Sequence, residues 1–276
     1  MTTLVFDPGY SSVKWAVADG GGVGPVTREP TAVAEVPDWA ARADMPGDAG
    51  GIEWRGRRFL VGEEALMAGL PLPTLADGFL TELAIPLFLR SIRERVNFDR
   101  AAVLISPADS ALKGRIEAVA REALGEVETV FVAQGAGIWF EAGGPSDALV
   151  LDVGFNTVDV LVVSRGRVRR DLSFSIRGAG LVSFLERVER DDPFMLARRL
   201  EGGDARLAEA AAEHYPGWLW RQLEARTEWR RRPDAAVIAG GGGARFLRGV
   251  RGVRVVRRPE TANVRGVAAM VEGGMV

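Results

Sequence analysis

Cysteine is absent from the 276-residue sequence, and histidine occurs once, at His214. The lack of cysteine excludes disulfide bonds, thiolate nucleophiles and cysteine-ligated zinc, and it is compatible with a reducing compartment. A single histidine argues against a Ser-His-Asp triad and excludes a metal site built from several histidines. No run of 18 apolar residues occurs, and the chain begins with a strand pattern rather than a signal peptide. We therefore expect a cytoplasmic protein with no direct membrane insertion.

The charge balance is close to neutral. The formal net charge is −2 and the isoelectric point is about 5.7, so the overall charge indicates neither a nucleic acid nor an anionic membrane as a partner. Hydrophobic residues make up 47% of the chain, which is enough for a sizeable core in one large or two moderate domains.

One local cluster combines aromatic and basic residues. Residues 193–232 have a helical pattern that we expect to be interrupted at Gly202-Gly203 and at Pro216-Gly217, and they contain Trp218, Trp220 and Trp229 among several arginines. Such interleaving is compatible with a nucleic-acid surface. We favour the simpler interpretation, an amphipathic helix with tryptophan in the core and arginine on its exposed face.

Two stretches of the sequence share one pattern. Residues 4–14 and 149–163 each contain an apolar run, then Asp, any residue, Gly, an aromatic residue, two small polar residues and Val. The pattern predicts two β-hairpins with a tight polar turn. Aligned on Asp7 and Asp152, the two copies end in opposite charges, Lys14 and Asp159.

The turn residues of these hairpins suit phosphate binding. Glycine followed by small hydroxyl or amide residues forms a concavity of backbone N–H groups. The candidate phosphate ligands are Gly9, Ser11, Ser12 and Lys14 in the first copy and Gly154, Asn156 and Thr157 in the second. Asp7 and Asp152 have the wrong charge for phosphate, so we predict that they hold Mg²⁺ through its waters. An ordinary hairpin with Asp and Gly in its turn is the alternative, and the matched pair favours phosphate.

Three further features belong with these hairpins. Gln134 follows the strand predicted at 127–133, where ligands lie in α/β sheets, although it could simply cap a helix. The preceding helix, predicted from 109 to 124, has Asp109 or Ser110 as its cap. Two glycine turns open later helices, and their residues are Gly178 and then Gly240, Gly241, Gly242 and Gly243. A glycine-rich turn after a strand lets a nucleotide approach the backbone, but the 240–243 turn lacks the spaced dinucleotide fingerprint.

The order of these features resembles the actin/Hsp70/sugar-kinase ATPase superfamily. The resemblance covers nearly the whole chain and includes a closing Ala-Asn-x-x-Gly segment at 262–266. Within the superfamily, residues 58–65 (Arg-Phe-Leu-Val-Gly-Glu-Glu-Ala) are similar to a stretch common in prokaryotic actin-like proteins of the plasmid-segregation type, the ParM/StbA group.

The resemblance implies an α/β fold of two actin-like, ribonuclease H-like domains around a nucleotide cleft. Residues 1–147 would form the first domain, with a C-terminal helix in 260–276 packed back on it, and 148–259 would form the second. ATP or GTP with Mg²⁺ would be the cofactor. By resemblance, Gln134 orients the attacking water and acts with Asp152 and Asp7 in catalysis, and the 240–243 turn contacts adenosine. Gln134 departs from the glutamate common in the ParM type, and the chain is short for the family.

Three functions follow, in order of preference. The first is an ATPase that polymerises into a cytoskeletal filament for plasmid or DNA segregation or cell organisation, with itself and a DNA-bound adaptor protein as partners. The second is a small-molecule kinase similar to the compact type III pantothenate kinases, for which Asp159 is the candidate base. The third is a non-polymerising nucleotide-binding interaction module.

Overall fold

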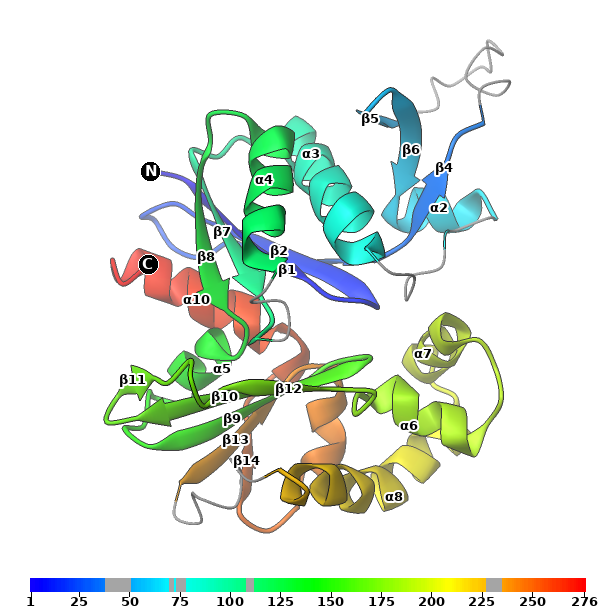
Figure 1. Ribbon diagram of the computed structural model, residues 1–276, viewed down its shortest axis with the longest axis vertical. Coiled ribbons are helices and arrows are strands. Elements are labelled where there is room, and N and C mark those ends of the chain that lie inside the picture. The colour runs from blue at the N-terminus through cyan, green and yellow to red at the C-terminus, as the bar shows by residue number, and fades with distance from the viewer. Residues whose placement is uncertain (38–50, 70–71, 73–77, 108–111, 227–234) are drawn as a thin grey trace.

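The first of two large sheets gathers the N-terminal strands. The computed structural model describes all residues except 38–50, 70–71, 73–77, 108–111 and 227–234 (Figure 1). The strand order of this sheet is β3-β2-β1-β7-β8, with β1 antiparallel to β2 and parallel to β7. Its strands are β1 (Thr3–Pro8), β2 (Ser12–Ala18), β3 (Thr27–Pro30), β7 (Arg100–Ile105) and β8 (Glu128–Ala133).

Helices cover both faces of this sheet. Alternate residues of β1 point to opposite faces, as strand geometry requires. Leu4 and Phe6 pack with α3 (Ile85–Arg95) and α4 (Lys113–Leu124), while Val5 packs with α10 (Ala262–Glu272). The sheet is buried on both sides, which explains why β1 reads as a continuous apolar run.

A smaller sheet projects from the same half of the chain. It has the order β4-β6-β5, and α2 follows β6 directly. A π-helical stretch, η1, then leads into α3, whose first turn contains Pro86. The bounds are β4 (Val33–Glu35), β5 (Ile52–Trp54), β6 (Arg57–Val61), α2 (Gly62–Met67) and η1 (Phe79–Ala84).

The second large sheet is built from the C-terminal half. Its order is β11-β10-β9-β13-β14, with β12 paired to β10. The strands are β9 (Ala148–Val153), β10 (Thr157–Ser164), β11 (Arg167–Val168), β12 (Phe174–Arg177), β13 (Ala236–Gly240) and β14 (Val253–Val255). One face packs on α6 (Leu181–Val188), α7 (Pro193–Glu201), α8 (Ala205–Glu224) and the 3₁₀ segment η3 (Gly242–Leu247), and the other packs on α5 (Ala136–Glu141). A short 3₁₀ turn, η4 (Pro259–Thr261), leads into α10.

Helices α5 and α10 cross between the two large sheets. They touch through backbone at Gly137 and Gly266: a Cβ on Gly137 would lie 2.8 Å from Asn263 Cα, and a Cβ on Gly266 would lie 2.5 Å from Gly137 Cα. Because only glycine allows such an approach, these two residues set the distance between the helices.

The expected interruption at Pro216-Gly217 is wrong, because α8 continues through both residues. Proline in a helix removes a hydrogen bond. Here Tyr215 and Trp218 lie on either side of Pro216, and both rings pack against Phe184 with centroids 5.6 and 5.7 Å away. This buried aromatic contact holds both halves of the helix in place. Trp229 and the predicted caps Asp109 and Ser110 lie outside the described residues.

Candidate nucleotide site

The two predicted hairpins are confirmed and carry their polar residues to one cleft. In β1–β2, Asp7 is the register partner of Lys14, and in β9–β10, Asp152 is the register partner of Asp159. All four residues line the same cavity between the two large sheets. Asp7 and Asp152 are 145 residues apart in the sequence. They come together because each lies at the end of the central strand of its own sheet.

The cavity contains most of the residues that the sequence singles out. The predicted site residues that line it are Asp7, Gly9, Ser11, Ser12, Lys14, Gln134, Asp152, Gly154, Thr157, Gly241, Gly242 and Gly243. Three other predicted site residues, Asn156, Gly178 and Gly240, do not line it. Asn156 accepts a hydrogen bond from the Ser183 hydroxyl at 3.1 Å, and its carbonyl accepts the N–H of Gly178 at 2.9 Å. Gly240 ends β13 against Ile138.

Asp7 is buried and held from two sides. Gln134 leaves the end of β8 and donates from Nε2 to Asp7 Oδ1 at 2.8 Å. Lys14 Nζ lies 3.8 Å from Asp7 Oδ2, a charge-assisted contact across the hairpin. Gln134 thus does not cap a helix with its side chain, since α5 begins without a side-chain cap.

Asp152 is held by a residue that the sequence reasoning missed. Asn263, near the start of α10, donates from Nδ2 to Asp152 Oδ2 at 2.6 Å. Its Oδ1 accepts the Gly135 N–H at 2.8 Å, so one buried amide joins three segments of the chain. The Ala-Asn-x-x-Gly segment was the available signal, but nothing local to it indicates the partner.

The two carboxylates repel each other across the cleft. Burial, followed by the negative charges of Asp7 and Asp159, raises the pKa of Asp152 to about 7, against the opposing effects of Lys14 and Asn263. Two buried carboxylates with unfavourable mutual charge fit a hydrated Mg²⁺, which prefers oxygen ligands and keeps several waters. Among the described residues, no group of three or more His, Cys, Asp or Glu side chains is placed to hold a metal ion directly.

Asp159 is buried and lines the same cavity. Its carboxylate accepts hydrogen bonds from the Ser106 hydroxyl at 2.8 Å and from the Ser175 hydroxyl. Leu80 and Ile116 line the same cavity.

The glycine turn after β13 packs closely on β9. Gly241 has a positive φ of 83°, and a Cβ there would lie 2.5 Å from the Val153 carbonyl oxygen. A Cβ on Gly243 would lie 2.6 Å from a Val153 methyl group, whereas Gly242 has nothing within 4 Å of its Cβ position. Packing within the second sheet thus accounts for two of these glycines, and Gly242 leaves backbone accessible in the cleft.

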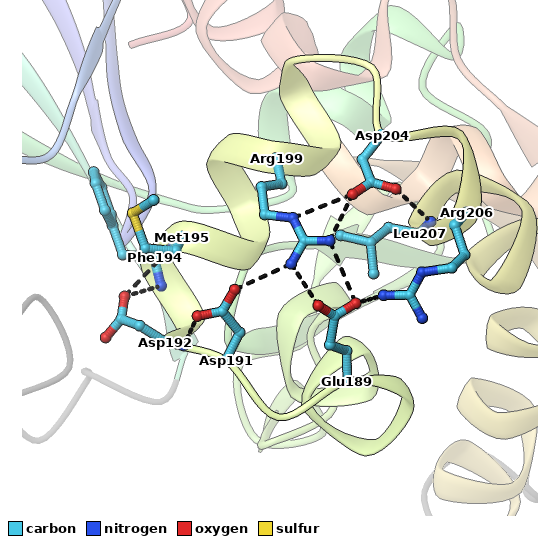
Figure 2. Close-up of polar contacts among 9 residues, drawn as sticks. All are labelled: Glu189, Asp191, Asp192, Phe194, Met195, Arg199, Asp204, Arg206 and Leu207. Carbon is cyan, nitrogen blue, oxygen red and sulfur yellow. Dashed lines mark hydrogen bonds and ion pairs between the residues drawn. The ribbon is translucent and has the colours of Figure 1, made fainter.

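Helix α7 reaches across the mouth of the cleft. Glu201 pairs with Arg28 of β3, whose Nε also donates to the Ser12 hydroxyl at 3.0 Å, and Arg198 lies 3.7 Å from Glu63. Figure 2 shows what holds the C-terminal end of α7 in place. The Arg199 guanidinium donates hydrogen bonds to three carboxylates, those of Glu189, Asp191 and Asp204.

Solved structures with this arrangement cover the whole chain. AlfA from Bacillus subtilis plasmid pLS32, in its filament structure, has a TM-score of 0.62 at 15% identity, with 98% of each chain covered. The apo ParM protein of pSK41 has a TM-score of 0.61 at 14% identity, covering 99% of this chain and 98% of ParM. MreB5 of Spiroplasma citri bound to ADP has a TM-score of 0.63 at 16% identity, covering 99% and 98%.

The chain has the fold of the prokaryotic actin-like proteins. No protein-family model and no curated protein sequence matches it. The actin-like fold consists of two α/β domains around a cleft, as the resemblance implied, and it accounts for the paired hairpins at the ends of β1 and β9.

Proposed function

We propose that this chain is an actin-like ATPase that binds Mg-ATP or Mg-GTP between its two domains and polymerises. The observation that carries the proposal is the pair of Asp-x-Gly hairpins whose carboxylates, Asp7 and Asp152, face one cavity. MreB5 is bound to ADP and a MamK mutant to AMPPNP in structures of this fold, which supports a nucleotide as the occupant.

The site residues have separate roles in this proposal. Backbone and hydroxyl groups of the two turns, including Ser11 and Thr157, bind phosphate oxygens, and Lys14 adds a positive charge. Asp7 and Asp152 hold the waters of Mg²⁺, which neutralises charge on the phosphates. We assign Gln134 the role of orienting the attacking water; its Nε2 donates to Asp7 Oδ1 at 2.8 Å, which places it at the cleft. We place the domain boundaries at 147 and 259, with α10 returning to the first sheet.

Polymerisation is the second half of the proposal. AlfA and MamK form filaments in structures that match this chain over 98% of its length. We infer that this chain also assembles with copies of itself in the cytoplasm, and that a DNA-bound adaptor links the filament to a plasmid or to another DNA cargo. Within the described residues, no helix is both long enough and apolar enough to cross a membrane.

The test combines light scattering with phosphate release after addition of Mg-ATP. We expect a rise in scattering that depends on protein concentration, and its loss in Asp152→Asn. Asp171→Asn is the matched control, because Asp171 lies outside the cleft and pairs with Arg169 at the surface. Persistent monomers that nevertheless bind nucleotide would overturn polymerisation, and failure to bind nucleotide would overturn the whole proposal.

A small-molecule kinase is the second candidate, because one observation favours it. Asp159, a buried carboxylate, lines the cavity together with the apolar side chains of Leu80 and Ile116, and an acceptor could bind beside it. A general base at that position would take a proton from a substrate hydroxyl. ADP release that requires a particular hydroxyl-bearing compound, and that is lost in Asp159→Asn, would establish this function in place of the first.

A further inference from the structure

Arginine recurs at every third position after the glycine turn. The positions are 245, 248, 251, 254 and 257, with Arg258 next to the last, and no acidic residue occurs between 244 and 259. Arg245 lines the nucleotide cleft. The other five form what we call the arginine row, and its members are Arg248, Arg251, Arg254, Arg257 and Arg258.

The arginine row is exposed and lacks internal counter-charges. All five residues are exposed, and in the described part of the chain none of them pairs with a carboxylate. Arg254 donates to the Ala142 carbonyl at 3.0 Å, which fixes its side chain over the end of α5. The contrast within the same domain is Arg199, which is surrounded by three carboxylates (Figure 2).

The row follows the outer edge of the second sheet. β14 is the edge strand of this sheet. Within it, Val253 and Val255 pack toward the core, and Arg254 between them points to the opposite face. Two open hollows of about 470 and 400 Å³ flank the strand, and both include Arg257 in their walls. The edge therefore presents exposed cationic groups on β14 and on the segments before and after it, beside concave surface. Glu141, the acidic residue in the larger hollow, pairs with Arg265.

The charge of the chain is divided unevenly between its halves. Residues 1–147 contain 13 basic and 21 acidic side chains, a net charge of −8. Residues 148–276 contain the remaining 22 basic (35 − 13) and 16 acidic (37 − 21) side chains, a net charge of +6. The near-neutral total thus conceals a basic second domain whose unpaired cations gather at one edge.

We propose that the arginine row binds the phosphate backbone of double-stranded nucleic acid. Guanidinium groups match phosphate oxygens in charge and fork geometry. The row has no exposed aromatic side chain on which single-stranded bases could stack. Val253, Val255 and Val256 are partly or fully buried, so the row offers no apolar surface for an apolar helix to bind. The inference goes beyond the proposed function, because it requires neither a bound nucleotide nor a filament.

The test is fluorescence anisotropy of a labelled duplex of about 20 base pairs, with nucleotide-free protein and EDTA. Five phosphate contacts give a slope of log affinity against log salt near −4.5, or about 500-fold weaker binding at about 200 mM than at about 50 mM salt. Combined Arg251→Gln, Arg257→Gln and Arg258→Gln substitutions are expected to reduce the slope by about 2.7.

The matched control removes the same charge elsewhere. Arg58, Arg121 and Arg221 are exposed and have no ion pair among the described residues, so their combined replacement by glutamine is expected to leave the slope unchanged. Equal slopes for the two triple variants would overturn the proposal. Competition by polyglutamate as effective as competition by unlabelled duplex would also overturn it, and would identify an acidic protein segment as the ligand.

Discussion

Replacement of Gly137 by alanine tests whether the α5–α10 crossing is set by backbone contact. Helix propensity alone predicts that this substitution stabilises the protein by up to about 1 kcal/mol. The crossing predicts the opposite sign. The new Cβ would lie 2.8 Å from Asn263 Cα and closer still to its carbonyl oxygen, whereas ordinary contact begins at 3.4 Å.

The nearest atom, the Asn263 carbonyl oxygen at 2.1 Å, must therefore move about 1.3 Å (3.4 − 2.1) to reach ordinary contact distance. Overpacking of this kind costs about 1–3 kcal/mol, and the carbonyl that collides belongs to the residue that holds Asp152. We expect a net destabilisation of about 1–2 kcal/mol after the propensity gain, together with weaker nucleotide binding.

Urea denaturation followed by circular dichroism measures the change. Gly114→Ala is the matched control, because Gly114 is also the second residue of its helix and has nothing within 4 Å of its Cβ position. It is expected to be neutral or stabilising. If Gly137→Ala raised the urea midpoint as much as Gly114→Ala, the backbone contact would not limit the distance between α5 and α10.

Three further predictions concern other residues. Asn263→Ala leaves the Gly135 N–H and one Asp152 oxygen without their partner, so we expect the free energy of unfolding to fall by about 2 kcal/mol in urea titration. Nucleotide binding, measured by calorimetry, should weaken, and an unchanged affinity would contradict the role of Asn263. Pro216→Ala restores a helical N–H in α8 and should raise the urea midpoint, and a lower midpoint would show that the proline is required. The raised pKa of Asp152 means that the folded state binds its proton more tightly than the unfolded state, so its stabilising effect is complete below about pH 4 and disappears as the pH rises through about 7. Without Mg²⁺, Asp152→Asn should therefore flatten the fall in urea midpoint between these limits, and an unchanged fall would assign it to other groups.

The hairpins could be predicted from sequence because each is local. Asp7 and Lys14 lie in one hairpin, and Asp152 and Asp159 lie in another, so apolar runs and turn residues suffice to place them. Their meeting in one cleft required the resemblance, since nothing local specifies it.

The missing parts depend on distant contacts. Asn263 is 111 positions from Asp152, and its amide looks like an ordinary helix residue until α10 is placed against α5. Pro216 misled for a similar reason, because the rings of Tyr215, Trp218 and Phe184 outweigh a local rule. The alternating pattern of residues 168–176 predicts one continuous strand. The structure instead has β11 and β12 separated by a turn, in which the Arg169 carbonyl accepts the N–H groups of Leu172 and Ser173.

The position of Asn263 has a consequence for synthesis on the ribosome. Every strand of both sheets precedes α10 in the chain, so a nascent chain can pair its strands before the amide that holds Asp152 has been translated. Until then Asp152 lacks its buried donor, and the Gly135 N–H lacks its acceptor. The cleft is consequently complete only after α10 has been translated, and the nucleotide binding and assembly proposed above would begin only then.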